Sequence, residues 1–196
     1  DAVAMVSSAG LVTSVADGTT TITATSGEAS DTVAVTVLQT ATSIELSDTV
    51  LTFPSLGDTA TLVAAVKDDN GTEISGAAVT WTTSAEGVAT VSDAGLVTAV
   101  TNGTATITAT SGVLEATAAA TVSQVASSIV LSDTVPTFAS LTDTTQLTAT
   151  VKDANDSTMA GATVSWATSD TTIATVSTTG LVTSVANGTA TITATS

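Results

Sequence analysis

Apolar and polar residues alternate along most of this chain with a period of two. In the segment TATITAT at residues 104–110, Ala105, Ile107 and Ala109 would face one side and the threonines the other. Such alternation is typical of a β-strand with one buried and one solvated face. Similar short runs are separated throughout by Gly, Asn, Asp and Ser, which favour turns. No segment has the period of a helix, so the sequence predicts an all-β fold.

The same sequence phrases recur at a constant spacing of 85 residues. Trp81 and Trp166 are separated by this distance, and so are Lys67 and Lys152. The stretches LVTSVADGTTTITATS, LVTAVTNGTATITATS and LVTSVANGTATITATS start at positions 11, 96 and 181 and align without gaps. Aligned on this period, the chain consists of the C-terminal part of a repeat (1–40), a complete repeat (41–125) and a repeat that lacks its last strand (126–196).

The complete repeat is expected to contain seven strands, at residues 43–46, 59–67, 79–83, 88–91, 96–100, 104–110 and 115–122. Seven short strands in a repeat of this length are typical of an immunoglobulin-like (Ig-like) β-sandwich. The predicted architecture is therefore a series of tandem Ig-like β-sandwiches of about 85 residues. We expect Leu62, Trp81, Leu96 and Ile107 to be buried in this sandwich, and Trp166 in the next one.

The two incomplete repeats raise the question of whether they complete each other between chains. Residues 1–26 and 171–196 occupy the same positions of the repeat, so these two segments would compete for one place. An excerpt from a longer repetitive protein is therefore the favoured interpretation, and strand exchange between chains is the alternative.

The chain is strongly acidic, with two Lys and Arg residues against 18 Asp and Glu residues and a formal net charge of −16. This charge repels the phosphates of nucleic acids and anionic lipid headgroups, so neither is an expected partner. No apolar run approaches the roughly 18 residues that a membrane span needs, so no membrane insertion is expected in this segment.

The composition offers few groups for catalysis. His and Cys, on which general-base and nucleophilic catalysis most often depend, are absent. The acidic residues fall mostly at the ends of expected strands and in turns, where Asp is favoured because its side chain bonds to the turn backbone. We therefore expect that the chain is not an enzyme and has no catalytic or cofactor-binding residues.

Two acidic turns contain oxygen ligands of the kind that calcium prefers. The candidates are Asp68, Asp69 and Asn70 in one turn and Asp153, Asn155 and Asp156 in the other. Both turns lack the twelve-residue EF-hand pattern, so a solvated turn is the favoured interpretation and a weak calcium site is the alternative. No other metal or cofactor is expected.

Four asparagines begin Asn-x-Ser/Thr sequons in expected turns, namely Asn70, Asn102, Asn155 and Asn187. In a secreted protein these residues would be candidate glycosylation sites. Asn-Gly is also the favoured dipeptide of tight hairpins, so a turn-forming role is the preferred interpretation.

The complete repeat resembles a known family. Its segments SIELSDT (43–49), VTWTTS (79–84) and VATVSDAGLVTAVTNGTATITAT (88–110) are together similar to the bacterial Ig-like domain, group 2. This family occurs in intimin- and invasin-type adhesins, in other repetitive surface proteins and in some phage virion proteins. The resemblance covers essentially the whole chain. It implies a cell-surface, extracellular or virion location, a structural or adhesive role, and no catalytic residues.

The junctions between repeats read VLQTATSI (37–44) and VSQVASSI (122–129) and contain neither Gly nor Pro. Such short junctions leave little room for a flexible linker, so successive modules should stack end to end. We therefore expect a spacer or scaffold in an extended rod or filament, whose partners are neighbouring repeats and like chains. The alternatives are an adhesin module that binds a glycan or protein on another cell, and a phage tail or capsid decoration. Exposed Thr, Ser, Ala and Asp residues make few binding hot spots and favour the spacer.

Overall fold

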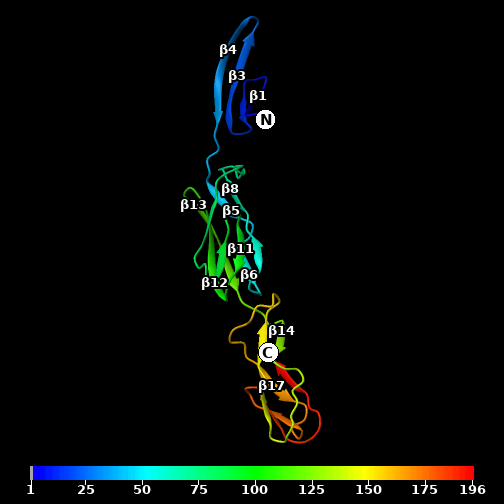
Figure 1. Ribbon diagram of the computed structural model, residues 1–196. Helices are drawn as coiled ribbons and strands as arrows, with labels where there is room; N and C mark the ends of the chain where they lie inside the picture. Colours follow the sequence, from blue (N-terminus) through cyan, green and yellow to red (C-terminus); the bar gives the residue numbers. More distant parts are fainter. Residues whose placement is uncertain (1) are drawn as a thin grey trace. The chain divides into compact units, whose positions relative to one another are not determined.

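The computed structural model of the chain describes residues 2–196, and every regular element in this range is a β-strand (Figure 1). The predicted all-β fold is confirmed. The chain divides into two units. The first consists of the residues up to Ser47, Ala64–Thr80 and Ala109–Ala116. The second consists of Asp48–Val63, Trp81–Thr108 and Thr117–Ser196. The described residues include no helix that could cross a membrane.

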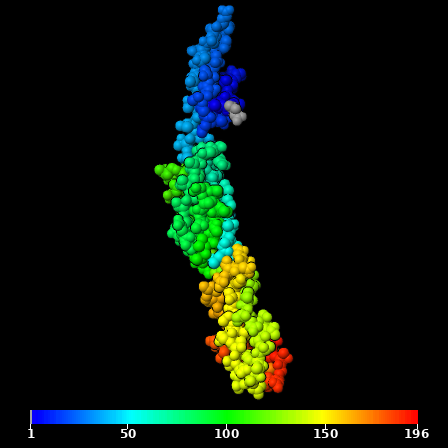
Figure 2. All heavy atoms as spheres, viewed as in Figure 1, coloured from blue at the N-terminus to red at the C-terminus, as the bar shows by residue number. Residues whose placement is uncertain are grey.

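The partial repeat at the start of the chain is built from two hairpins. β1 (Ala4–Val6) pairs with β2 (Val12–Ser14), and the longer β3 (Gly18–Ser26) pairs with β4 (Ala29–Val37) along its whole length. None of residues 2–40 is buried. Figure 2 shows the atoms of this hairpin in blue, and those at its tip are open to solvent on the face shown.

The complete repeat contains nine strands. They are β5 (Ser43–Leu46), β6 (Val50–Phe53), β7 (Thr59–Thr61), β8 (Ala64–Lys67), β9 (Thr80–Thr83), β10 (Ala89–Val91), β11 (Leu96–Ala99), β12 (Gly103–Ser111) and β13 (Leu114–Val122). One sheet has the order β6-β13-β12-β9, another the order β10-β11-β7, and β5 pairs with β8. Alternating inward and outward side chains on these strands form the two faces of an Ig-like sandwich.

The single strand expected at residues 59–67 is two strands. β7 pairs with β11 and β8 pairs with β5, so the chain changes sheets between them. Leu62 lies at this change, and its N–H donates a hydrogen bond of 2.9 Å to the carbonyl oxygen of Gly95. β6 was not expected at all, because its four residues lie between an acidic turn and Pro54. It pairs with β13 as a parallel strand, and this pairing places it at one edge of the β6-β13-β12-β9 sheet.

The predicted burial of Ile107 and Leu62 is confirmed, but that of Leu96 is wrong. Leu96 is 41% exposed, whereas the next residue, Val97, has no exposed surface. Two adjacent apolar residues fit the period-two pattern in either register, and the pairing of β11 with β10 and β7 decides that Val97 points inward.

Trp81 and Trp166 are half-buried, so their predicted burial is also only partly met. Each indole ring lies over a buried glycine of its own repeat. A Cβ atom at Gly95 would lie 3.2 Å from Cε2 of Trp81 and 2.3 Å from the carbonyl oxygen of Leu62. Gly95 also has a φ of 76°, so both its backbone and its surroundings require glycine.

The third repeat copies the strand pairing of the second, apart from two positions. Its strands are β14 (Ser128–Leu131), β15 (Thr144–Gln146), β16 (Ala149–Lys152), β17 (Ser165–Thr168), β18 (Ala174–Val176), β19 (Leu181–Ser184) and β20 (Ile192–Thr195). β14 pairs with β16, β19 lies between β15 and β18, and β17 pairs with β20. Residues 135–138, which correspond to β6, do not form a strand, and residues 126–196 do not include the positions that correspond to β13.

Candidate functional site at the junctions between repeats

The residues that join the second and third repeats are fixed to both of them by backbone hydrogen bonds. The N–H of Val125 donates 2.8 Å to the carbonyl oxygen of Pro54, in the second repeat. The N–H of Ser127 donates 2.8 Å to the carbonyl oxygen of Lys152, in the third repeat. Only Ala126 lies between these two anchored positions, so the junction has almost no free linker.

A buried carboxylate at this junction accepts hydrogen bonds from both repeats. Oδ2 of Asp153 accepts from Nε2 of Gln124 and from the N–H of Leu56, each at 2.9 Å. Its Oδ1 accepts from the N–H groups of Asn155 and Ser157, at 3.0 and 2.9 Å. Asp153 is only 1% exposed. Four donors therefore take the place of water around both of its oxygens.

The surroundings of Asp153 shift its pKa in two opposite directions. Burial by itself raises the pKa, because desolvation disfavours the ionised form. The hydrogen bonds from Gln124, Leu56, Ser157 and Asn155 outweigh this effect and hold the pKa below its usual value. Asp153 is consequently ionised at neutral pH, and hydrogen-bond donors stabilise its charge.

Two further side chains complete the contact. Nδ2 of Asn155 donates to the carbonyl oxygen of Leu56 at 3.0 Å and to Oδ1 of Asp58 at 2.8 Å. Asn102 holds Gln124 in place, because its Oδ1 accepts the Gln124 N–H at 2.8 Å and its Nδ2 donates to the Gln124 side chain at 3.1 Å. We call the set Leu56, Asp58, Asn102, Gln124, Asp153 and Asn155 the junction clasp.

The same bonds occur one repeat earlier, at the junction between the first and second repeats. Nε2 of Gln39 donates to Oδ2 of Asp68 at 3.0 Å, and the Gln39 N–H donates to Oδ1 of Asp17 at 2.7 Å. Oδ1 of Asp68 accepts from the N–H groups of Asn70 and Thr72. Each position precedes its counterpart by 85 residues, with Asp17 in the place of Asn102. The glutamine and aspartate part of the clasp therefore recurs with the repeat.

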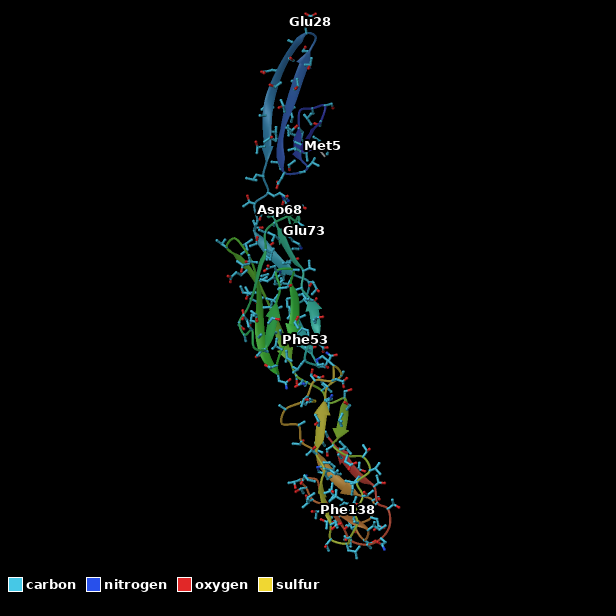
Figure 3. All side chains as sticks on the ribbon, viewed as in Figure 1. Met5, Glu28, Phe53, Asp68, Glu73 and Phe138 are labelled. Carbon is cyan, nitrogen blue, oxygen red and sulfur yellow. The ribbon has the colours of Figure 1, made fainter. Side chains whose placement is uncertain are left out.

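Asp68 differs from Asp153 in its burial. The counterparts of Leu56 and Asp58 would precede residue 1, and Asp68 is half-buried. Its pKa is also lowered, chiefly by the hydrogen bond from Gln39 and then by that from Thr72. Figure 3 labels Asp68 and Glu73, between which this turn runs.

The six candidate calcium ligands have varied surroundings. Asp68 and Asp153 already use both oxygens as hydrogen-bond acceptors, and the side-chain amide of Asn155 donates across the junction. Asp69, Asn70 and Asp156 are exposed, and Oδ1 of Asp156 lies 4.0 Å from Nζ of Lys152. Within residues 2–196, no three acidic side chains converge as metal ligands would. Calcium binding by these turns stays a prediction.

The four candidate glycosylation sites are all exposed. The side-chain amides of Asn102 and Asn155 donate hydrogen bonds within the junction clasp. A glycan would leave the Asn155 nitrogen with a single N–H, so one of its two bonds would be lost. The side chains of Asn70 and Asn187 are exposed and take no part in the bonds of the junction clasp. The structure therefore places two of these four candidates in the junction clasp, and glycosylation of any of the four stays a prediction.

Four residues of the junctions were not expected to be functional from the sequence, namely Gln39, Gln124, Leu56 and Asp58. The two glutamines could have been found from the sequence. Each is the long polar side chain in a junction of small and apolar residues, and the two are separated by one repeat of 85 residues. Leu56 contributes through its backbone, which leaves no mark on the sequence pattern.

Comparisons with known proteins agree with this architecture. The family profile described as bacterial Ig-like domain (group 2) matches residues 40–122 and 127–196, and one described as bacterial Ig-like domain matches residues 2–39. No curated protein sequence matches the chain.

Three solved structures are among those similar to the chain. The crystal structure of the S-layer protein rSbsC is 24% identical over 98% of this chain and 27% of that chain, with a TM-score of 0.44. The bacterial integrin-binding protein invasin is 22% identical over 93% of this chain and 43% of that chain, with a TM-score of 0.45. The Escherichia coli adhesin FdeC is 20% identical over 84% and 60%, with a TM-score of 0.41. The chain thus covers less than two thirds of each of these proteins.

Proposed function

Because the chain belongs to the bacterial Ig-like domain (group 2) family, we propose that it is a structural, non-catalytic module that serves as a spacer or scaffold in an extended extracellular rod. The observation that carries this proposal is the recurrence of the clasp. The glutamine-to-aspartate bond measures 3.0 Å at one junction and 2.9 Å at the other, and the bond from the glutamine N–H measures 2.7 and 2.8 Å.

A spacer must transmit the position of one module to the next, and the clasp supplies the necessary contacts. The bonds from Gln124 and Leu56 place an ionised carboxylate of the third repeat against the second repeat. Hydrogen bonds to an ionised group are shorter and about twice as strong as neutral ones. Rotation of one repeat against the other would leave the charge of Asp153 buried with fewer donors, which is costly.

The composition of the chain and the hydrogen bonds of its carboxylates also support a structural role. The chain lacks His and Cys, and the carboxylates of Asp68 and Asp153 are engaged in hydrogen bonds between repeats. A net charge of −16 keeps such a chain soluble at high local density, as a repetitive surface protein requires. A cell-surface or extracellular location follows from this role in the proposal.

The proposal is tested by the relative motion of the second and third repeats in solution. Nitrogen-15 relaxation should give one rotational diffusion tensor for both repeats in the unmodified chain. The double variant Gln124→Ala with Asn155→Ala should give two independent tensors. The variant Asn70→Ala, whose side chain is exposed outside the clasp, is the matched control and should behave as the unmodified chain. Independent tumbling of the unmodified repeats would refute the spacer.

A further inference from the structure

Two strands from opposite ends of the second repeat's sequence lie side by side and run in the same direction. β6 pairs in parallel with residues 119–122 of β13. Hydrogen bonds from the N–H groups of Ala119, Ser123 and Val125 to the carbonyl oxygens of Thr49, Phe53 and Pro54, at 2.8, 3.0 and 2.8 Å, belong to this pairing and extend it beyond both ends of β6. We call residues 49–54 and 119–125 the parallel ladder.

The direction of these strands determines how the parallel ladder responds to a pull along the chain. The chain enters β6 at its N-terminal end and leaves β13 at its C-terminal end, toward the third repeat. In a parallel pair these two ends lie at opposite ends of the ladder. Tension between them therefore slides the two strands along each other. β5 precedes β6 and pairs with β8, so β6 takes the load once that short pair separates.

Sliding loads the hydrogen bonds of the parallel ladder together. A pull that opened the strands from one end would instead load the bonds one after another. A single backbone hydrogen bond is weak in net terms, so rupture in sequence meets little resistance at any step. Simultaneous rupture raises the barrier to unfolding, and this barrier governs forced unfolding. The parallel arrangement is therefore the stronger one for this direction of pull.

The side chains of the parallel ladder oppose sliding as well. Leu51 and Phe53, the latter labelled in Figure 3, are buried on β6, and their partners Ala120 and Val122 are buried on β13. Alternate residues of a strand point to opposite faces, so a slip of one residue would turn the exposed Val50 toward the core. The strands thus have no adjacent register in which to settle, and sliding must expose the core.

The parallel ladder continues directly into the junction with the third repeat. Its last bond joins the Val125 N–H to the Pro54 carbonyl oxygen. Two residues further on, the N–H of Ser127 bonds to the carbonyl oxygen of Lys152 in the third repeat. Since there is almost no free linker between these bonds, tension that arrives through the third repeat acts on the ladder at once.

We propose that the parallel ladder is a mechanical clamp with which the second repeat resists tension along the chain. This function rests on the proposed role as a spacer, because a module of an extended rod is pulled along its chain when the ends of the rod are drawn apart. An unfolded chain spans up to about 3.3–3.6 Å per residue, so a repeat that opened under load would lengthen greatly. The clamp preserves the spacing that a rod has to maintain.

The experiment is single-molecule force spectroscopy on the full chain, which is pulled at two introduced cysteines. The chain contains no Cys, so the introduced thiols define the direction of the pull. Asp48→Cys with Val125→Cys loads the ladder along its strands. Asp48→Cys with Thr117→Cys loads it across them, because the register places Thr117 level with Asp48. All three side chains are exposed. The second repeat should unfold at a several-fold higher force in the first arrangement, and equal forces would overturn the proposal.

A change at the exposed Ser123 tests the bonds of the ladder themselves. Ser123→Pro removes the N–H that bonds to Phe53, at the end of the ladder remote from Asp48. This variant should unfold at a lower force along the strands and at an unchanged force across them, because peeling starts at the other end. Ser123→Ala keeps the N–H and is the matched control. An unchanged force along the strands in Ser123→Pro would also overturn the proposal.

The two arrangements of cysteines decide the matter even if Ser123→Pro does not fold. The pull is confined to the second repeat, so its outcome is separate from that of the spacer. Equal forces would refute the clamp and leave the spacer standing, whereas independent tumbling of the second and third repeats would refute the spacer alone.

Discussion

Gln124 and Asp153 lie 29 residues apart in the chain, in different repeats, and are joined by a side-chain hydrogen bond of 2.9 Å at a carboxylate that is almost fully buried. Gln39 and Asp68 make the same bond one repeat earlier, at a half-buried carboxylate. The two pairs thus form a natural comparison in which the chemistry is constant and the burial differs.

Removing each glutamine should reveal this difference. Gln124→Ala should lower the free energy of unfolding by on the order of 1 kcal/mol, because one oxygen of Asp153 loses a donor that water cannot easily replace. Gln39→Ala should cost less, because water reaches the half-buried Asp68. Urea denaturation of both variants, followed by tryptophan fluorescence, measures the difference. Equal losses in the two variants would mean that burial at the second junction does not strengthen the bond.

Acid should weaken the second junction through Asp153. Because its pKa is lower in the folded chain than in the unfolded chain, its contribution to stability is fully present above about pH 4 and is lost as the pH falls through the folded-state pKa. The pKa values of Asp68 and Asp170 are lowered too, so the unfolding free energy of the unmodified chain should fall with acidification for several reasons.

The variant Asp153→Asn isolates the contribution of the junction. It should be less stable than the unmodified chain at pH 7, and its stability should fall less steeply between pH 5 and pH 2. Denaturation curves at several pH values give both slopes. Parallel slopes for the two proteins would show that Asp153 is not the titrating group.

A methyl group at Gly95 should be far more damaging than one at Gly112. Both glycines have positive φ, so either alanine is strained by about 1–3 kcal/mol. At Gly112 the new Cβ meets open space, whereas at Gly95 it would lie 2.3 Å from the carbonyl oxygen of Leu62 and against the Trp81 ring. Gly95→Ala should therefore cost several kcal/mol more than Gly112→Ala, or prevent folding. Similar melting temperatures for the two variants would contradict this packing of Trp81.

The register of β11 predicts opposite responses at two adjacent residues. Val97 is fully buried, so Val97→Ala should destabilise the chain by about 1–3 kcal/mol. Leu96 is 41% exposed, so Leu96→Ala should change stability by less than about 1 kcal/mol. Thermal unfolding of both variants settles the register, and a larger loss at Leu96 would mean that β11 faces the other way.

The same two residues show what the sequence could and could not predict. Period-two alternation predicted the inward side of β12 correctly, because Ala105, Ile107 and Ala109 alternate with threonines. In β11 the apolar pair Leu96 and Val97 fits either register, so only pairing with neighbouring strands decides. Local pattern suffices where one face is polar and fails where both faces are apolar.

The candidate site was harder to predict than the fold. The sequence drew attention to Asp68 and Asp153 as oxygen-rich turns, but their partners come from another repeat and, for Leu56, from the backbone. Which residues become partners depends on the contact between neighbouring repeats. Within the sequence of one repeat, only the glutamine at the junction indicates this contact.

If one repeated junction spaces the modules at a constant distance, small-angle X-ray scattering on chains of two, three, four and five complete repeats will show it. A strand of seven residues spans about 23 Å, so with its loops each module should add a constant increment of roughly 35 to 45 Å to the maximum dimension. A maximum dimension that levels off or grows irregularly with the number of repeats would mean that the junctions do not hold the modules at a constant spacing.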